Sequence, residues 1–315
     1  MTTAEPPVRI GIYVPQLQLS YDDLVERART CDELGFDSFW LFDHLYGAML
    51  PDLPAFEGWT LATALLTQTE RLRVGHMVLC ATFRHPALLG KMATTLDVIS
   101  GGRLNFGIGS GSVEQEHHEA GIPWGTFAER SEILEETLAI VSGMFASSRT
   151  TYEGRHFQVR DLPNVPQPVQ QPRPPIYIGG VGERRTLPLV ARFADVWNVP
   201  TYALAELAHK SAVLDDTCAR IGRDPATIRR SLEAVMVVAP DDEAVADAVP
   251  VAERRFGGAG FGLHDGGYIG TPATVADRML RHRELGFTEF VFFLHDRASR
   301  PTLELLATDV VPQLA

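Results

Sequence analysis

The chain has 315 residues, of which 45% are hydrophobic, and this composition supports the core of one large domain or of two ordinary ones. Its formal net charge of −12 gives an acidic surface that repels phosphate backbones, so we expect no nucleic-acid binding. No apolar run approaches the roughly 18 residues that span a bilayer, and the first ten residues lack the pattern of a signal peptide. The three cysteines are scattered, which predicts a reducing, cytoplasmic environment.

The first half of the chain alternates short apolar runs with amphipathic segments. We expect strands over residues 9–14, 38–42, 72–79 and 104–108, and helices over 20–34, 59–69, 86–99 and 126–144. Ser20 and Thr126 each stand three residues before an acidic residue, which is the capping-box spacing of a helix start. The strand-like runs are continuously apolar, as is typical of a sheet covered on both faces.

The second half repeats this rhythm, with strands expected over 175–178, 195–199, 231–238 and 289–294 and helices over 183–193, 203–221, 241–255 and 272–285. Two insertions interrupt it: a hairpin within 152–161 and a glycine-rich segment, 256–268, that we expect to be a mobile loop over the site. Eight strand–helix repeats predict one domain over 1–315, a (β/α)8 TIM barrel with insertions at the C-terminal mouth. A doubly wound open sheet is the alternative.

In a parallel barrel the residues that follow the strands gather at one mouth, and this filter selects the candidate catalytic residues. Asp43 and His44 follow the second strand, where a carboxylate can accept a hydrogen bond and an imidazole can exchange a proton near neutral pH. Glu114, in the loop after the fourth strand, is a further acid–base candidate. The same residues could instead cap or pack: Asp43 against the next segment, and His44 within the core.

Small residues at three other strand ends would let a ligand approach the backbone, and those after the third strand would let a planar ring lie against it. These candidate cofactor-binding residues are Cys80 and Ala81 after the third strand, Ser110 and Gly111 after the fourth, and Gly179, Gly180 and Val181 after the fifth. The last group opens a helix, whose start can bind an anion such as phosphate. The adjacent His117 and His118 point in different directions and cannot chelate together, so we expect no metal site.

Five long segments carry a family resemblance: YDDLVERARTCDELGFDSFWLFDH, RHPALLGKMATTLDVISGGRLNFGIGSG, ERSEILEETLAIV, PPIYIGGVGERRTLPLVARFADVWN and GTPATVADRMLRHRELGFTEFVFF. Over nearly the whole chain they resemble the luciferase-like monooxygenase family of flavin- and deazaflavin-using oxidoreductases, which are (β/α)8 barrels. Flavin-using members often show Glu-His-His after the second strand. The Asp43-His44-Leu45 of this chain resembles instead the branch that uses coenzyme F420, an 8-hydroxy-5-deazaflavin.

This resemblance implies an F420-dependent oxidoreductase that transfers a hydride between the deazaflavin and a small organic substrate. It places Asp43 near the ring and gives His44 substrate or proton handling. It also implies a strand-three bulge around Cys80-Ala81, often a non-proline cis peptide, and a phosphate at Gly179-Gly180. Some sugar-phosphate dehydrogenases of this branch carry a Glu where this chain has Ser112, which argues against a glucose-6-phosphate-like reaction.

Two alternatives remain at this stage: a monooxygenase of the same fold that uses reduced FMN, and a non-catalytic ligand-binding barrel. We also expect a homodimer, since family members commonly dimerise through outer helices near the third and fourth strands. The 86–99 helix carries more apolar surface than one inward stripe needs, namely Leu88, Leu89, Met92, Leu96 and Ile99.

Overall fold

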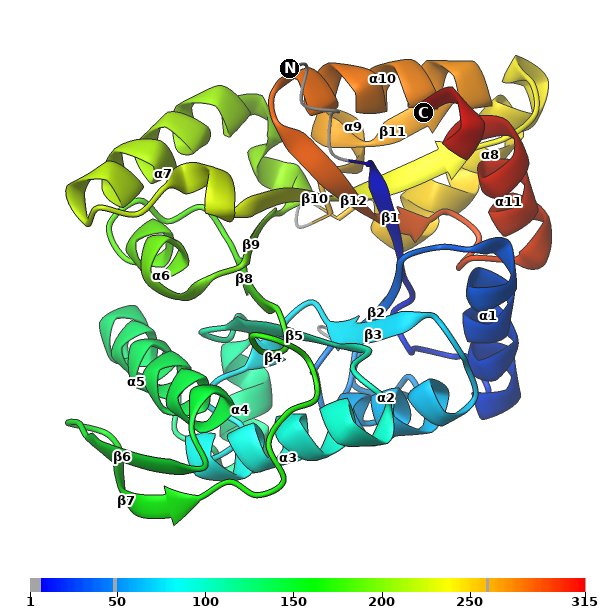
Figure 1. Cartoon of the computed structure of the whole chain (residues 1–315). Coiled ribbons are helices and arrows are strands. Elements are labelled where there is room, and N and C mark those ends of the chain that lie inside the picture. Colours follow the sequence, from blue (N-terminus) through cyan, green and yellow to red (C-terminus); the bar gives the residue numbers. More distant parts are fainter. Residues whose placement is uncertain (1–6, 48–49, 259–260, 315) are drawn as a thin grey trace.

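The computed structural model of the protein describes residues 7–47, 50–258 and 261–314. Within these residues, eight parallel strands close into a barrel (Figure 1). In spatial order they are β1 (Arg9–Tyr13), β2 (Ser38–Leu41), β3 (Arg73–His76), β5 (Leu104–Gly109), β8 (Ile176–Gly179), β9 (Val196–Val199), β10 (Arg229–Val238) and β12 (Phe287–Leu294). Because β12 pairs back onto β1, with Arg9 opposite Glu289, the predicted TIM barrel is confirmed and the open sheet is wrong.

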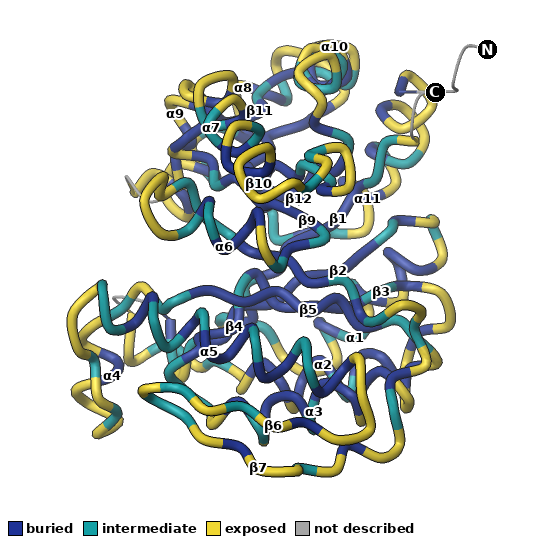
Figure 2. Tube along the Cα trace, turned by 60° about the vertical axis from the view of Figure 1, so that its left-hand side comes forward, coloured by how far each residue is buried: buried dark blue, intermediate teal, exposed yellow. Residues whose placement is uncertain are grey.

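Helices surround the strands, and most begin and end where the sequence predicts. They are α1 (Tyr21–Leu34), α2 (Gly58–Thr67), α3 (Pro86–Ile99), α5 (Phe127–Ala146), α6 (Thr186–Phe193), α7 (Leu207–Arg220), α10 (Pro272–Glu284) and α11 (Arg300–Leu305), with short helical segments η1 (Thr201–Glu206), η2 (Pro225–Thr227), η4 (Leu306–Val310) and η5 (Val311–Leu314). The capping boxes at Ser20 and Thr126 both form. Figure 2 shows buried strands inside and exposed residues on the outer faces of the helices. None of the described helices is long and apolar enough to cross a membrane.

The third strand differs from its predicted continuous run. β3 ends at His76, and β4 (Leu79–Cys80) resumes the pairing against Ile108 and Gly109 of β5. The peptide bond between Met77 and Val78 is cis, so the implied bulge lies upstream of Cys80-Ala81. The Tyr13 hydroxyl donates a 2.7 Å hydrogen bond to the Met77 carbonyl and fixes this segment from inside the barrel.

The first insertion forms the predicted hairpin, but away from the mouth. Strands β6 (Arg149–Glu153) and β7 (Gln158–Pro163) pair antiparallel and pack on the outside of α3 and α5, where Val159 meets Ile140 and Met144. The Asn164 amide ties the end of the hairpin to the Met144 carbonyl at 2.7 Å. The hairpin connects the far end of α5 to the start of β8, so its place follows from the direction of α5.

The second insertion lies at the mouth, and it is more ordered than a loop. The predicted helix before it, α8 (Asp242–Phe256), leads into the insertion, which contains α9 (Leu263–Gly266) and the start of β11 (Tyr268–Gly270), a strand that extends the sheet beside the end of β10. The fully buried Tyr268 ring, edge-on to Phe292, anchors it. Residues 259–260 of the predicted loop lie outside the described residues. Another helix, α4 (Glu114–Ala120), forms where a polar loop was expected.

Candidate active site

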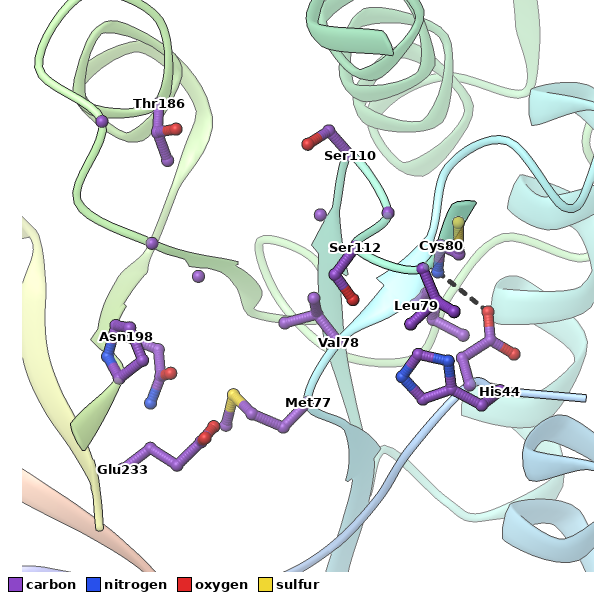
Figure 3. A pocket seen from close by; sticks show the side chains of 18 of the residues that line it. His44, Met77, Val78, Leu79, Cys80, Ser110, Ser112, Thr186, Asn198 and Glu233 are labelled. Atoms are coloured by element: carbon purple, nitrogen blue, oxygen red, sulfur yellow. Dashed lines mark hydrogen bonds between the residues drawn. The ribbon is translucent and has the colours of Figure 1, made fainter. Parts of the chain in front are cut away.

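The mouth of the barrel contains a cavity of about 430 Å³, which we call the first cavity (Figure 3). Strand ends and the segments after them line it from several sides. Among the lining residues are eight that the sequence predicts: Asp43, His44, Cys80, Ser110, Gly111, Gly179, Gly180 and Val181. The barrel therefore brings together predicted residues as far apart in the sequence as Asp43 and Val181.

Two predicted site residues do not reach this cavity. The Ala81 side chain is 1% exposed and packs into the hydrophobic core, because β4 turns it away from the mouth. Glu114 lies on the solvent side of α4, where its carboxylate is 3.7 Å from the exposed His118 imidazole four residues later. On α4, the helical repeat that directs Glu114 and His118 outward turns Glu116 and His117 inward, and the latter two are buried.

Glu116 holds His44, and sequence reasoning missed this partner. The His44 Nδ1 lies 2.8 Å from Glu116 Oε2, and the other oxygen of the carboxylate accepts the Leu45 backbone N–H. Because an ionised carboxylate only accepts, Nδ1 carries the proton and Nε2 is the ring atom left to accept or deliver one. The segment EQEHHEA could have been recognised as a short helix, with Glu116 on one face of it. Because a loop was predicted there, the helical period was not applied to it.

Asp43 is held by the protein itself. Its carboxylate accepts hydrogen bonds from both terminal nitrogens of Arg84, at 2.7 and 2.8 Å, and from the Cys80 backbone N–H at 2.9 Å, drawn in Figure 3. Arg84 also reaches Glu57 at 2.8 Å. A buried, bidentate pair of this kind is rigid. Asp43 thus positions the Leu79–Cys80 segment of the cavity wall.

The Cys80 thiol forms a small polar cluster with Thr82 and His117. The thiol is 3.0 Å from the Thr82 hydroxyl, which is 2.6 Å from His117 Nε2, and His117 Nδ1 is 2.8 Å from the Val113 carbonyl. Nδ1 therefore donates to that carbonyl, and Nε2 accepts from Thr82. Burial raises the pKa of the Cys80 thiol. A neutral thiol suits a wall residue better than a nucleophile.

Two glycine-rich turns line the first cavity. At Gly111, φ is +85°, and a Cβ would lie 2.8 Å from the Cys80 sulfur. At Gly180, φ is +109°. Its N–H donates to the Asn198 carbonyl at 3.0 Å, and its own carbonyl accepts the Trp197 indole N–H at 2.8 Å. The Gly180 amide is therefore already bonded, so donors for a phosphate would come from the following residues toward Thr186.

The start of α6 borders the same cavity. The helix begins at Thr186, three residues later than predicted, and Gly182 and Thr186 both line the cavity. Arg184 and Arg185 lie exposed just before it. A helix start of this kind, flanked by two cations, favours an anionic group.

Glu233 is a second residue that the sequence reasoning missed. It lies on β10 and lines the first cavity, as Met77 does, and both are labelled in Figure 3. Burial raises the pKa of its carboxyl to about 8. Its side chain has no ion pair or hydrogen bond within the described part of the chain, so it holds a proton at neutral pH. The available signal was one acidic residue inside the apolar run 231–238.

A second cavity of about 480 Å³ adjoins the first, and His44 lines both. Its wall is aromatic, with Tyr13, Phe42, Phe256, Phe261 and Phe293. One side of His44 is thus set against glycines and backbone, and the other against large rings. This arrangement suits a reaction between two bound molecules, with an imidazole between them.

A closed parallel barrel with such a mouth is the architecture of a (β/α)8 enzyme. Residues 7–262 match the sequence model described as luciferase-like monooxygenase, and the chain belongs to this family, as its sequence segments predicted.

Named relatives agree with this membership. The F420-dependent glucose-6-phosphate dehydrogenase of Microbacterium testaceum (strain StLB037) is 31% identical over 337 residues, covering 98% of each chain. The F420-dependent hydroxymycolic acid dehydrogenase of Mycobacterium tuberculosis (strain ATCC 25618 / H37Rv) is 27% identical, covering 78% of this chain and 67% of the relative. A solved F420-dependent secondary alcohol dehydrogenase in complex with an F420-acetone adduct shares the fold, with a TM-score of 0.82 at 19% identity over 98% of this chain and 100% of that one.

Proposed function

We propose that the protein is an oxidoreductase that uses coenzyme F420 and transfers a hydride between this deazaflavin and a small organic substrate. Relatives named as F420-dependent dehydrogenases, one of them aligned over nearly the whole chain, support this function. The observation that carries it is the Glu116-oriented His44 imidazole, which stands between two cavities of different character.

The residues of the first cavity fit such a cofactor. Gly111 and Gly179 leave the wall free of Cβ atoms where a flat ring system could approach, and Val78, next to Gly179, adds an apolar surface. The start of α6 with Arg184 and Arg185 would hold the phosphate end. When bound, the deazaflavin supplies two-electron hydride chemistry.

The protein's own groups would orient the reactants and handle the proton. Asp43 and Arg84 keep the Leu79–Cys80 wall in place. His44 Nε2 accepts or delivers the proton at the substrate, while Glu116 keeps the ring in one tautomer and orientation. Glu233, protonated at neutral pH, holds a second proton at the floor of the cavity.

Binding and turnover test this function directly. Oxidised F420 and FMN are titrated separately into the purified protein, and binding is followed by their absorbance and fluorescence. We expect saturable binding of F420 and none of FMN. Oxygen uptake with reduced FMN would identify the monooxygenase instead, and binding of neither cofactor would indicate the non-catalytic barrel.

We further propose a single-domain, cytoplasmic homodimer. All three cysteines are free and buried, which supports a reducing compartment. Of the five apolar residues expected at the dimer interface on α3, Leu88 and Ile99 are 57% and 52% exposed, whereas Leu89 and Leu96 pack into the core. Light scattering should give twice the monomer mass of 34.6 kDa, and the monomer mass alone would overturn the dimer.

A further inference from the structure

The second cavity has a wall suited to an apolar ligand. Tyr13 stacks on Phe293 with ring centroids 4.1 Å apart, and Phe261 meets Phe293 edge-on at 5.7 Å. Phe256 closes the cluster, 5.2 Å from Phe261. The Tyr13 hydroxyl is bonded to the Met77 carbonyl, so this wall offers ring faces rather than polar partners. Such a surface favours an apolar or aromatic molecule over a polyhydroxylated one.

The same cavity is bordered by three arginines: Arg254, Arg255 and Arg297. Arg255 donates to the His295 carbonyl at 2.5 Å, and Arg297 donates to the Leu17 and Gln18 carbonyls at 3.4 Å. Within the described residues none of the three pairs with a carboxylate. In a chain with 40 acidic and 28 basic residues, three such cations at one cavity are a local excess of positive charge.

Arg255 and Arg297 lie close enough for their charges to repel, and the fold holds Arg297 in a fixed turn. Burial, with Arg255 and Arg27 nearby, lowers the pKa of Arg297. Arg297 and Ala298 have φ values of 64° and 60°, in the left-handed region that ordinary residues seldom adopt. The Arg27 side chain donates to the Arg297 carbonyl at 2.7 Å and supports this turn. An anionic ligand group would relieve the repulsion between these cations.

From these observations we infer the substrate class: an organic anion with an apolar, preferably aromatic, body. Its body would occupy the Phe256–Phe261–Phe293 wall with its reacting carbon beside His44, and its carboxylate or phosphate would bind the arginines. This inference rests on the proposed function, because it places the substrate next to the cofactor cavity. It differs from a sugar phosphate, whose hydroxyl groups would find few partners on this wall.

Binding to the cofactor-free protein tests the cavity without any requirement for turnover. The probes are 3-phenylpropanoate, its neutral analogue 3-phenylpropanol, phenyl phosphate and glucose 6-phosphate, each titrated by calorimetry. We expect 3-phenylpropanoate or phenyl phosphate to bind about tenfold more tightly than the alcohol, as a charge-assisted contact with arginine implies. The stronger of the two anions identifies the head group. Equal binding of the alcohol, or tighter binding of glucose 6-phosphate, would overturn the inference.

Substitutions identify the arginines as the source of the effect. Arg254→Gln removes an exposed guanidinium that has no bonded partner in the described structure, so the fold should be retained. Arg297→Gln removes a half-buried one, with Arg297→Lys as the charge-preserving variant. We expect both Gln variants to weaken the anion several-fold and to leave the alcohol unchanged. Arg300→Gln is the matched control, since Arg300 pairs with Glu33 at 2.9 Å outside the cavity. Loss of affinity in that control equal to the loss in the cavity variants would contradict the inference.

The two proposals fail in different ways. Tight anion binding without F420 binding would contradict the proposed function while leaving the arginine-bordered cavity supported as a ligand site. F420 binding with no preference for apolar anions would contradict the substrate class alone.

Discussion

The two cavities that meet at His44 differ in the kind of residue that lines them. In the first, two glycine-rich turns bring backbone to the surface, and the polar side chains Asp43 and His44 are held by Arg84 and Glu116. In the second, large aromatic side chains form the wall, and the arginines that border it have no carboxylate partner among the described residues. Glycine turns therefore form part of the wall of the first cavity, whereas large side chains form most of the wall of the second.

This contrast suggests that the cofactor bound in the first cavity is fixed by the fold, whereas the substrate bound in the second can change. A cavity made of backbone turns accepts one flat ligand and tolerates little change, because each Cβ intrudes. A cavity made of side chains can change its ligand through a few substitutions while the strands stay in place. The structure thus supports one cofactor type with a substrate set separately, and the following substitutions test this division.

The largest effect is expected at the imidazole that the two cavities share. His44→Ala should lower kcat by roughly 10²- to 10⁴-fold, the usual contribution of a proton-transfer group, with F420 affinity changed less than twofold. Glu116→Gln should lower kcat less, because the ring stays but loses its fixed tautomer. Glu114→Gln is the control on the same helix, and its kcat should match the wild type. Comparable losses in Glu114→Gln and Glu116→Gln would contradict the assignment.

A smaller effect is expected from closing the glycine wall. A Cβ at Gly179 would lie 3.4 Å from Val78 Cγ1 and 3.9 Å from Asn198 Oδ1, contacts the fold accommodates. Gly179→Ala should keep its melting temperature but weaken F420 about tenfold, close to 1.4 kcal/mol. Gly180→Ala should lose roughly 1 kcal/mol of stability, because its φ of +109° strains any side chain. Wild-type F420 affinity in a folded Gly179→Ala protein would place the cofactor elsewhere.

The barrel itself was predictable because its strands are buried on both faces. Every residue of β2 and of β5 is buried, and both segments are mostly apolar, with Ser38 and Asn105 as their polar residues. The helix starts at Ser20 and Thr126 were equally visible, since a capping box is a local pattern. The strand ends then located Asp43, His44 and the glycine turns without any contact information.

The partners of those residues were not predictable, because they come from distant segments. Glu116 meets His44 across 72 positions, and Arg84 meets Asp43 across 41. Helix and strand periodicity relates only residues a few positions apart, so it cannot predict either pair. Glu114 was chosen over Glu116 because the helical period of α4 was not recognised, and that period decides which carboxylate faces inward. The aromatic wall and its arginines likewise arise only when α8 folds over the end of β12.

The last effect is on stability rather than on turnover, and it concerns the Glu233 carboxyl in the first cavity. Burial raises the pKa of Glu233 from 4.5 to about 8. The folded protein therefore keeps a proton that the unfolded chain releases, so this contribution to stability is fully present below pH 4.5 and is lost as the pH rises to about 8.

Glu233→Gln mimics the protonated side chain at every pH. Relative to wild type, its melting temperature should rise progressively from pH 5 to pH 8 and then stay constant. Glu253→Gln, an exposed position on α8, should show no such trend. A difference between Glu233→Gln and wild type that is independent of pH would mean that Glu233 is ionised in the folded protein, and that the first cavity holds a charge there rather than a proton.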